Sequence, residues 1–289
     1  QFNNPVANVN VTFTVTGGGG TITPASPATV ATNTSGVAAL TSWRVGTTAG
    51  GNTLTAVSTG LTGSPLTFTA TGTAGAATQL AIQAGNGQSA TVNTTVATNP
   101  SVVVRDQFNN PVANVNVTFT VTGGGGTITP ASPATIATNT SGVAALTSWR
   151  LGTTAGSNTL SAASTGLAGS PVTFTATGTA GAATQLAFTV QPTDVGADQP
   201  VTPALEVTVR DAFGNNVTSS TADITLTIVD PSGTPGAILS GGGPVSAVGG
   251  VAIFSALSID LVGLNYQLRA AANGLTAAVS SQFNVTVFP

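Results

Sequence analysis

The sequence predicts an all-β chain of tandem two-sheet sandwich modules, of which the first is incomplete. Three observations predict this fold. Short segments alternate between apolar and polar residues, turn signals separate them, and the whole pattern recurs along the 289 residues. No segment shows a convincing helical period. Many short strands without helices are typical of a β-sandwich.

The strands are predicted from strict alternation. In segment 9–15, valine and phenylalanine alternate with asparagine and threonine, and segments 52–58 and 66–70 follow the same rule. A period of two with β-branched and aromatic residues indicates a half-buried strand. In segment 52–58 this places Leu54 and Ala56 toward the core.

The turns are predicted from asparagine, glycine and proline. Segments 3–5, 17–20 and 33–36 carry these residues between strands. Between Leu40 and Trp43 the apolar phase slips by one residue, which predicts a β-bulge near 41–42. We expect Trp43 and Trp149 to fill the space between the two sheets.

The modules are predicted from an internal repeat. Residues 1–81 match 107–187 at an offset of 106 and differ at seven positions. A diverged third copy follows, in which "VTVRDAFGNNV" at 207–217 resembles "VVVRDQFNNPV" at 102–112. The expected modules are residues 1–76, 77–182 and 183–289.

The composition excludes several classes of function. Charged residues are 4% of the chain, and Lys, His, Cys and Met are absent. Without Cys there is no disulfide or thiolate metal site, and five Arg without Lys do not suit nucleic-acid binding. No apolar run is long enough for a membrane span in this segment. Without Met, Gln1 is not expected to be a translation start, which suggests a processed or excised piece.

Catalysis is not expected. General acid–base chemistry uses His, Lys or paired carboxylates, and Glu206 is the one Glu. A Ser or Thr nucleophile would lack a base. The sequence therefore predicts no enzyme, no catalytic residue and no cofactor site.

Calcium is the one metal that the acids suggest. Asp194, Asp198 and Glu206 lie near the start of module three, and Asp211 lies at a turn with Asn215 and Asn216. Oxygen ligands at a junction could hold Ca²⁺ and stiffen it. Modules one and two carry no acid except Asp106, so solvated loop acids are the favoured interpretation.

Three motifs resemble a known family. These are Arg-Asp-x-Phe-Asn-Asn-Pro-Val at 105–112, Thr-Asn-Thr-Ser-Gly-Val-Ala at 32–38 and Ala-Gly-x-Asn-Thr-Leu at 49–54. Together they resemble tandem bacterial immunoglobulin-like domains of the invasin/intimin type, over essentially the whole chain. Module three departs from the pattern, with Val217 in place of the proline. The resemblance implies a secreted or cell-surface stalk or adhesive array, and no binding residue is carried over from it.

Module one lacks a counterpart of residues 77–106, which we expect to form the first two strands of module two. Their six apolar residues are Leu80, Ile82, Val92, Val96, Val102 and Val104. Burying them contributes roughly 9–18 kcal/mol, against about 5–15 kcal/mol for a whole domain. Module one should therefore not hold together alone. Either a longer array contains the missing strands, or another molecule donates one, or the module is partly disordered.

The expected function is structural. A surface of Thr, Ser, Asn and Ala with little charge favours assembly, so the expected partners are copies of this chain or neighbouring modules of a longer array. We expect load to pass through the junctions at 72–78 and 178–184. The alternative is an adhesin whose loops bind glycans or a host protein. Exposed Trp43, Trp149 or Tyr266 would favour the adhesin, and buried Trp the structural role.

Overall fold

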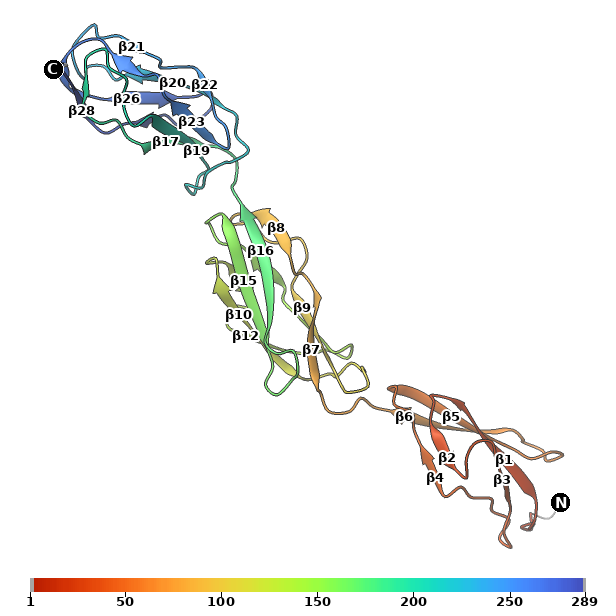
Figure 1. The fold of residues 1–289 in the computed structure, drawn as a ribbon. Coiled ribbons are helices and arrows are strands. Elements are labelled where there is room, and N and C mark those ends of the chain that lie inside the picture. Colours follow the sequence, from red (N-terminus) through yellow and green to blue (C-terminus); the bar gives the residue numbers. More distant parts are fainter. Residues whose placement is uncertain (1–2, 288–289) are drawn as a thin grey trace.

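A computed structural model describes residues 3–287, so the expectation about Gln1 lies outside the described residues. This part of the chain forms strands and no helix. Figure 1 shows three bodies following one another along the chain, with the two termini at opposite ends. We call them module one, module two and module three, and use the boundaries predicted above. The prediction of an all-β chain of tandem sandwiches with an incomplete first module is confirmed.

Module one contains six strands: β1 (Asn10–Gly17), β2 (Thr21–Thr23), β3 (Ala28–Ala31), β4 (Ser42–Arg44), β5 (Gly50–Val57) and β6 (Leu66–Gly72). They form a sheet of order β3-β1-β5-β6 and a small β2-β4 sheet. The predicted alternation is confirmed, because Phe13, Leu54 and Ala56 are buried while their polar neighbours are more exposed. The core is small, with Ile22 and Ala28 as its other buried residues.

Module two contains ten strands: β7 (Gln79–Ala84), β8 (Gln88–Thr91), β9 (Ser101–Arg105), β10 (Asn116–Gly123), β11 (Thr127–Thr129), β12 (Ala134–Ala137), β13 (Val143–Ala145), β14 (Ser148–Arg150), β15 (Gly156–Ala163) and β16 (Val172–Thr179). A sheet of order β12-β10-β15-β16-β8 faces a second layer made of β13-β9-β7 and β11-β14. Residues 77–106 therefore supply three strands rather than the two expected, because β8 joins the opposite sheet.

Module three contains twelve strands: β17 (Gln185–Val190), β18 (Val195–Gly196), β19 (Leu205–Arg210), β20 (Asp223–Ile228), β21 (Leu239–Ser240), β22 (Val245–Ser246), β23 (Val251–Phe254), β24 (Ser258–Ile259), β25 (Gly263–Tyr266), β26 (Leu268–Ala271), β27 (Ala278–Val279) and β28 (Phe283–Thr286). Its first sheet, β17-β19-β23, corresponds to β7-β9-β13 of module two. Module three has its own buried core, which includes Tyr266, Phe254 and Phe283.

The prediction of a β-bulge near 41–42 is wrong. In module two the chain leaves the β13-β9 ladder at Ala145 and joins the β14-β11 ladder at Ser148. The apolar phase slips there because the chain passes from one sheet to another. In modules one and two the register irregularities lie elsewhere, between Val15 and Gly17, between Ile82 and Ala84 and between Val121 and Gly123.

Candidate functional site

The first junction is organised by the turn of module two that directly follows β9. The buried carboxylate of Asp106 accepts hydrogen bonds from the N–H groups of Phe108 (2.8 Å) and Asn110 (2.9 Å) and from the Nδ2 of Asn110 (2.8 Å). Asp side chains commonly close such turns on backbone two residues on. Asn109 adopts the left-handed φ of 66° that the turn requires.

The same two side chains reach across to module one. Gly75 N–H donates to the Asp106 carboxylate at 2.8 Å. Asn110 Nδ2 donates to Thr47 O at 2.8 Å, and Asn110 Oδ1 accepts from Ala49 N–H at 2.8 Å. These five residues form what we call the junction clamp, and through it the turn of module two fixes a loop of module one.

The second junction repeats this clamp despite the divergence of module three. Gly181 N–H donates to the Asp211 carboxylate at 2.9 Å. Asn215 Nδ2 donates to Thr153 O at 2.8 Å, and its Oδ1 accepts from Ala155 N–H at 2.7 Å. Because diverged sequences keep the same contacts, the clamp is a property of the repeat and not of one junction.

The electrostatics of the clamp favour ionised aspartates. Burial alone raises the pKa of the Asp106 carboxyl, but the hydrogen bonds from the Asn110 side chain and from the N–H groups of Gly75, Asn110 and Phe108 outweigh burial and lower it to about 2. The pKa of Asp211 is also lowered, because Asn215, Gly181 and Phe213 offset its burial in the same way. Donors to the charged form therefore hold each carboxylate ionised.

An asparagine supports the loop that each clamp grips. Asn52 Oδ1 accepts from Gly46 N–H at 2.9 Å, and Asn158 Oδ1 accepts from Gly152 N–H at 2.9 Å. Module three has Tyr266 at the corresponding position, and its hydroxyl donates to Leu261 O at 2.8 Å. The loop at the far end of module three is thus built differently from the two that are clamped.

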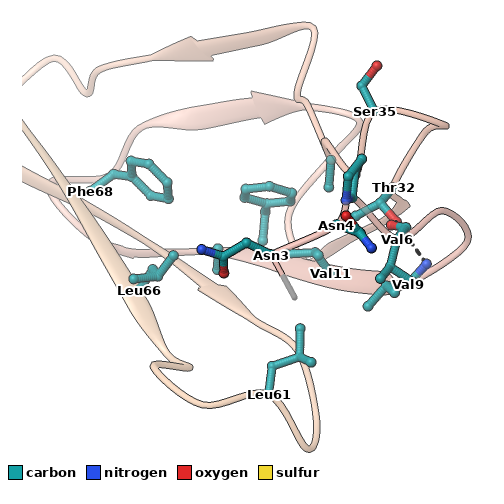
Figure 2. A pocket seen from close by; sticks show the side chains of 15 residues that line it. Asn3, Asn4, Val6, Val9, Val11, Thr32, Ser35, Leu61, Leu66 and Phe68 are labelled. Atoms are coloured by element: carbon teal, nitrogen blue, oxygen red, sulfur yellow. Dashed lines mark hydrogen bonds between the residues drawn. The ribbon is translucent and has the colours of Figure 1, made fainter. Parts of the chain in front are cut away.

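Module one carries a second candidate site, an open groove on its sheet. Figure 2 shows Leu66 and Phe68 on one wall, with Val6, Val9 and Val11 toward the other end. The groove has a volume of about 780 Å³. In module two, β7 and β9 lie in the layer that faces the corresponding surface, and β8 extends the sheet beyond β16.

The exposure of residues at the same repeat position in modules one and two shows how open this groove is. Phe68 is 46% exposed, whereas Phe174 at the same repeat position is fully buried. Leu40 and Trp43 are partly exposed, but Leu146 and Trp149 are buried. Since the two modules are nearly identical in sequence, the missing strands account for the difference.

Module one also has two backbone segments that lack the neighbouring strand seen in module two. Residues 36–40 and 142–146 share the sequence Gly-Val-Ala-Ala-Leu, yet only the second set forms a strand, β13, which pairs with β9. The outer edge of β16 pairs with β8, whereas β6 ends its sheet with no neighbouring strand on that side among the described residues. Identical residues therefore differ in structure where their partner strand is missing.

The calcium candidates are not brought together. Asp194 accepts from the Asn284 backbone N–H at 2.7 Å and from its Nδ2 at 3.2 Å, and Asp211 belongs to the clamp. Asp198 has a left-handed φ of 61°, and Glu206 lies in β19 opposite Ile253. Within residues 3–287, no three Asp, Glu, His or Cys side chains form a group that could hold a metal. Calcium stays a sequence-based prediction without a ligand cluster.

Arg150 and Arg44 occupy related positions next to the tryptophans. Arg150 Nε donates to Asn93 O at 2.8 Å within module two. Arg44 lines a small cavity at the first junction, together with Thr73 of module one and Phe108 of module two. Arg44 is thus an exposed residue beside the neighbouring module.

Sequence reasoning missed the clamp. It assigned Asp211, Asn215 and Asn216 to a possible calcium turn and gave Asn110 no role. A usable signal was present, because Asp-x-Phe-x-Asn recurs at 106–110 and 211–215, and Thr-Thr-Ala-Gly recurs at 47–50 and 153–156. Only the fold shows that the two motifs meet.

No protein-family model and no curated protein sequence matches the chain. Solved structures that it resembles include FdeC, an adhesin of Escherichia coli, with 18% identity, 99% of this chain and 88% of that chain covered, and a TM-score of 0.48. InvD of Yersinia pseudotuberculosis is 16% identical, with 98% of this chain and 89% of that chain covered and a TM-score of 0.48. Invasin, a bacterial integrin-binding protein, is 20% identical, with 100% of this chain and 55% of that chain covered and a TM-score of 0.41. One of them, invasin, carries the name of the family that the sequence motifs resemble. Residues 3–287 contain no helix that is long and apolar enough to cross a membrane.

The clamp predicts that Asn110→Ala will loosen the first junction. The substitution removes the bonds to Thr47 and Ala49 and the bond from Asn110 Nδ2 to Asp106, and it changes no apolar residue of the module cores. Because the chain has no Cys, Thr34→Cys and Thr140→Cys give two unique labelling points in exposed turns of modules one and two. We expect a broader distribution of label-to-label distances by pulsed electron resonance. Gln107→Ala is the control, since its side chain is exposed, and equal breadth in both variants would contradict the clamp.

The low pKa of Asp106, about 2, predicts how acid affects this junction. It lies below the value of about 3.9 for an unperturbed aspartate, so the contribution of the carboxylate is complete above pH 4 and is lost as the pH falls toward 2. The same labelled chain should keep a narrow distance distribution from about pH 7 to 4 and broaden between about pH 4 and 2. Broadening centred near pH 6 would exclude this carboxylate as the cause.

The open groove predicts unequal effects of matched substitutions. Phe174→Ala should destabilise module two by about 3–5 kcal/mol, and Phe68→Ala should destabilise module one by less than about half of that, because Phe68 is already half exposed. Module two is followed by Trp149 fluorescence in a Trp43→Phe background, and module one by Trp43 in a Trp149→Phe background. Similar losses in the two modules would mean that Phe68 is packed as tightly as Phe174.

Proposed function

We propose that this chain is a non-enzymatic extracellular structural protein, a stalk or a subunit of a surface fibre, made of clamped β-sandwich modules. Its partners are neighbouring modules and, through strand completion, the polypeptide that completes module one. The cell-surface location rests on the resemblance of the sequence motifs to invasin/intimin-type domains.

The recurrence of the junction clamp carries the proposal. Each clamp joins modules by three direct contacts from one Asp and one Asn, at 2.7–2.9 Å, with the same donors and acceptors at both junctions. In each clamp one of the three contacts, from the glycine N–H to the aspartate, is charge-assisted, and such bonds are stronger than neutral ones. Such a junction restricts bending between modules, which is what a stalk needs.

The environment of the tryptophans supports the structural role over glycan binding. Trp149 is fully buried, and the indole nitrogens of Trp43 and Trp149 are enclosed without a hydrogen-bond partner in the described structure. Tyr266 is buried as well. Because they are buried, Trp149 and Tyr266 cannot stack on a sugar from solvent.

A second function, adhesion to a protein, is favoured by one observation. The far end of module three exposes Leu261, Val262 and Leu264 in the loop that replaces the clamped Thr-Thr-Ala-Gly, and Ile238 is 63% exposed. Exposed apolar patches mark interaction sites more often than scattered apolar residues do. In this case the modules form the stalk and the end of module three makes the contact.

The test is electron microscopy of the full chain. We expect straight, three-bead particles with a narrow range of angles between beads. The double variant Asp106→Ala, Asp211→Ala should bend freely at both junctions, while Gln107→Ala should match the unmodified chain. Unmodified particles that bend as much as the double variant would contradict a clamped stalk.

A further inference from the structure

We propose that the open groove of module one is the acceptor site for a strand segment with the sequence pattern of residues 77–106, which enters the groove at the turn of Asn3 and Asn4. This inference rests on the strand completion included in the proposed function, and it names the segment, its register and its direction of entry.

Module two shows the proposed occupant in place. There, Leu80, Val102 and Val104 are buried against the sheet that carries Phe174. The residues of module two that form this surface recur in module one, with only conservative changes such as Leu66 for Val172. A surface that binds this segment in one module is therefore present in the other.

The backbone contacts fix the register. Thr175 N–H donates to Asn86 Oδ1 at 2.9 Å, and Thr175 O accepts from Gly87 N–H at 2.9 Å. On the other layer, Leu146 N–H donates to Pro100 O at 3.0 Å. The corresponding acceptor residues in module one are Thr69 and Leu40, both unchanged.

The turn that the segment would enter is already formed. Asn3 has a φ of 57°, like the 66° of Asn109. Thr32 Oγ1 donates to Val6 O at 2.7 Å, as Thr138 Oγ1 donates to Val112 O at 2.7 Å. A segment that ends in Arg-Asp, as 77–106 does, would place a carboxylate beside Asn4 and complete a clamp turn there.

Exchange between copies of this chain does not supply the segment. Each copy has one segment, 77–106, but two acceptor surfaces, in modules one and two. If one copy lends its segment to another, its own module two opens instead. Every arrangement of copies leaves one acceptor empty per chain. The proposed occupant is therefore a segment other than the one that each copy carries at 77–106, and the turn at Asn3 is where it would connect.

The experiment extends the full chain at its N-terminus with a second copy of residues 77–106. We expect the amides of Leu40 and Thr69 to exchange with solvent at least about tenfold more slowly than in the unextended chain, and the fluorescence of Trp43 to become less accessible to quencher. The control is an extension of the same composition in scrambled order. A third chain carries aspartate at the two added positions that correspond to Val102 and Val104.

Slower exchange with the native extension, but with neither the scrambled nor the aspartate-substituted extension, supports the proposal. Equal exchange in the native and scrambled extensions overturns it. A free peptide of residues 77–106 is the other arm, and protection by the peptide without protection by the extension would overturn entry at the turn of Asn3 and Asn4. Bending at the junctions does not depend on these outcomes, so a failure here is distinguishable from a failure of the stalk.

Discussion

The structure depends on the turn at 106–110, which directly follows a core strand of module two and also binds module one. The strand β9 covers the core of module two and ends at Arg105, and the next residue, Asp106, begins the clamp to module one. Closing a sandwich and fixing it to its neighbour are therefore consecutive steps along the chain. Because β19 and Asp211 have the same relation, the order of strand and clamp gives the array its direction.

The clamp explains how the modules are held together in a chain with so few charged residues. Each clamp carboxylate is satisfied by neutral N–H donors and not by a cation, with Gly75, Phe108 and Asn110 around Asp106. Ion pairs on a surface contribute little and are screened by salt. Buried charge–dipole contacts are screened less, so a chain with 4% charged residues can still hold its modules in fixed relation.

Sequence reasoning predicted local structure where alternation and burial agree. Phe13, Leu54 and Ala56 point inward as their spacing indicates, and the repeat predicted which strands recur. It failed where the partner of a residue lies far along the chain. The slip near Thr41 marks a change of sheet and not a bulge, and Asn110 meets Thr47 across 63 residues. Periodicity carries no information about such contacts, since it describes one segment at a time.

Modules one and two show most directly what local sequence cannot predict, because their sequences are nearly identical. Residues 36–40 and 142–146 are identical, but only the second set pairs as a strand, and Phe68 and Phe174 differ from half exposed to buried. Intrinsic β-propensity is therefore the same in both and does not decide the outcome. What decides it is a neighbouring strand that supplies backbone partners and an apolar cover. The front third of the repeat thus supplies the backbone partner of residues 142–146 and the apolar cover over Phe174, whereas strands that need neither, such as β1 and β10, form in both modules.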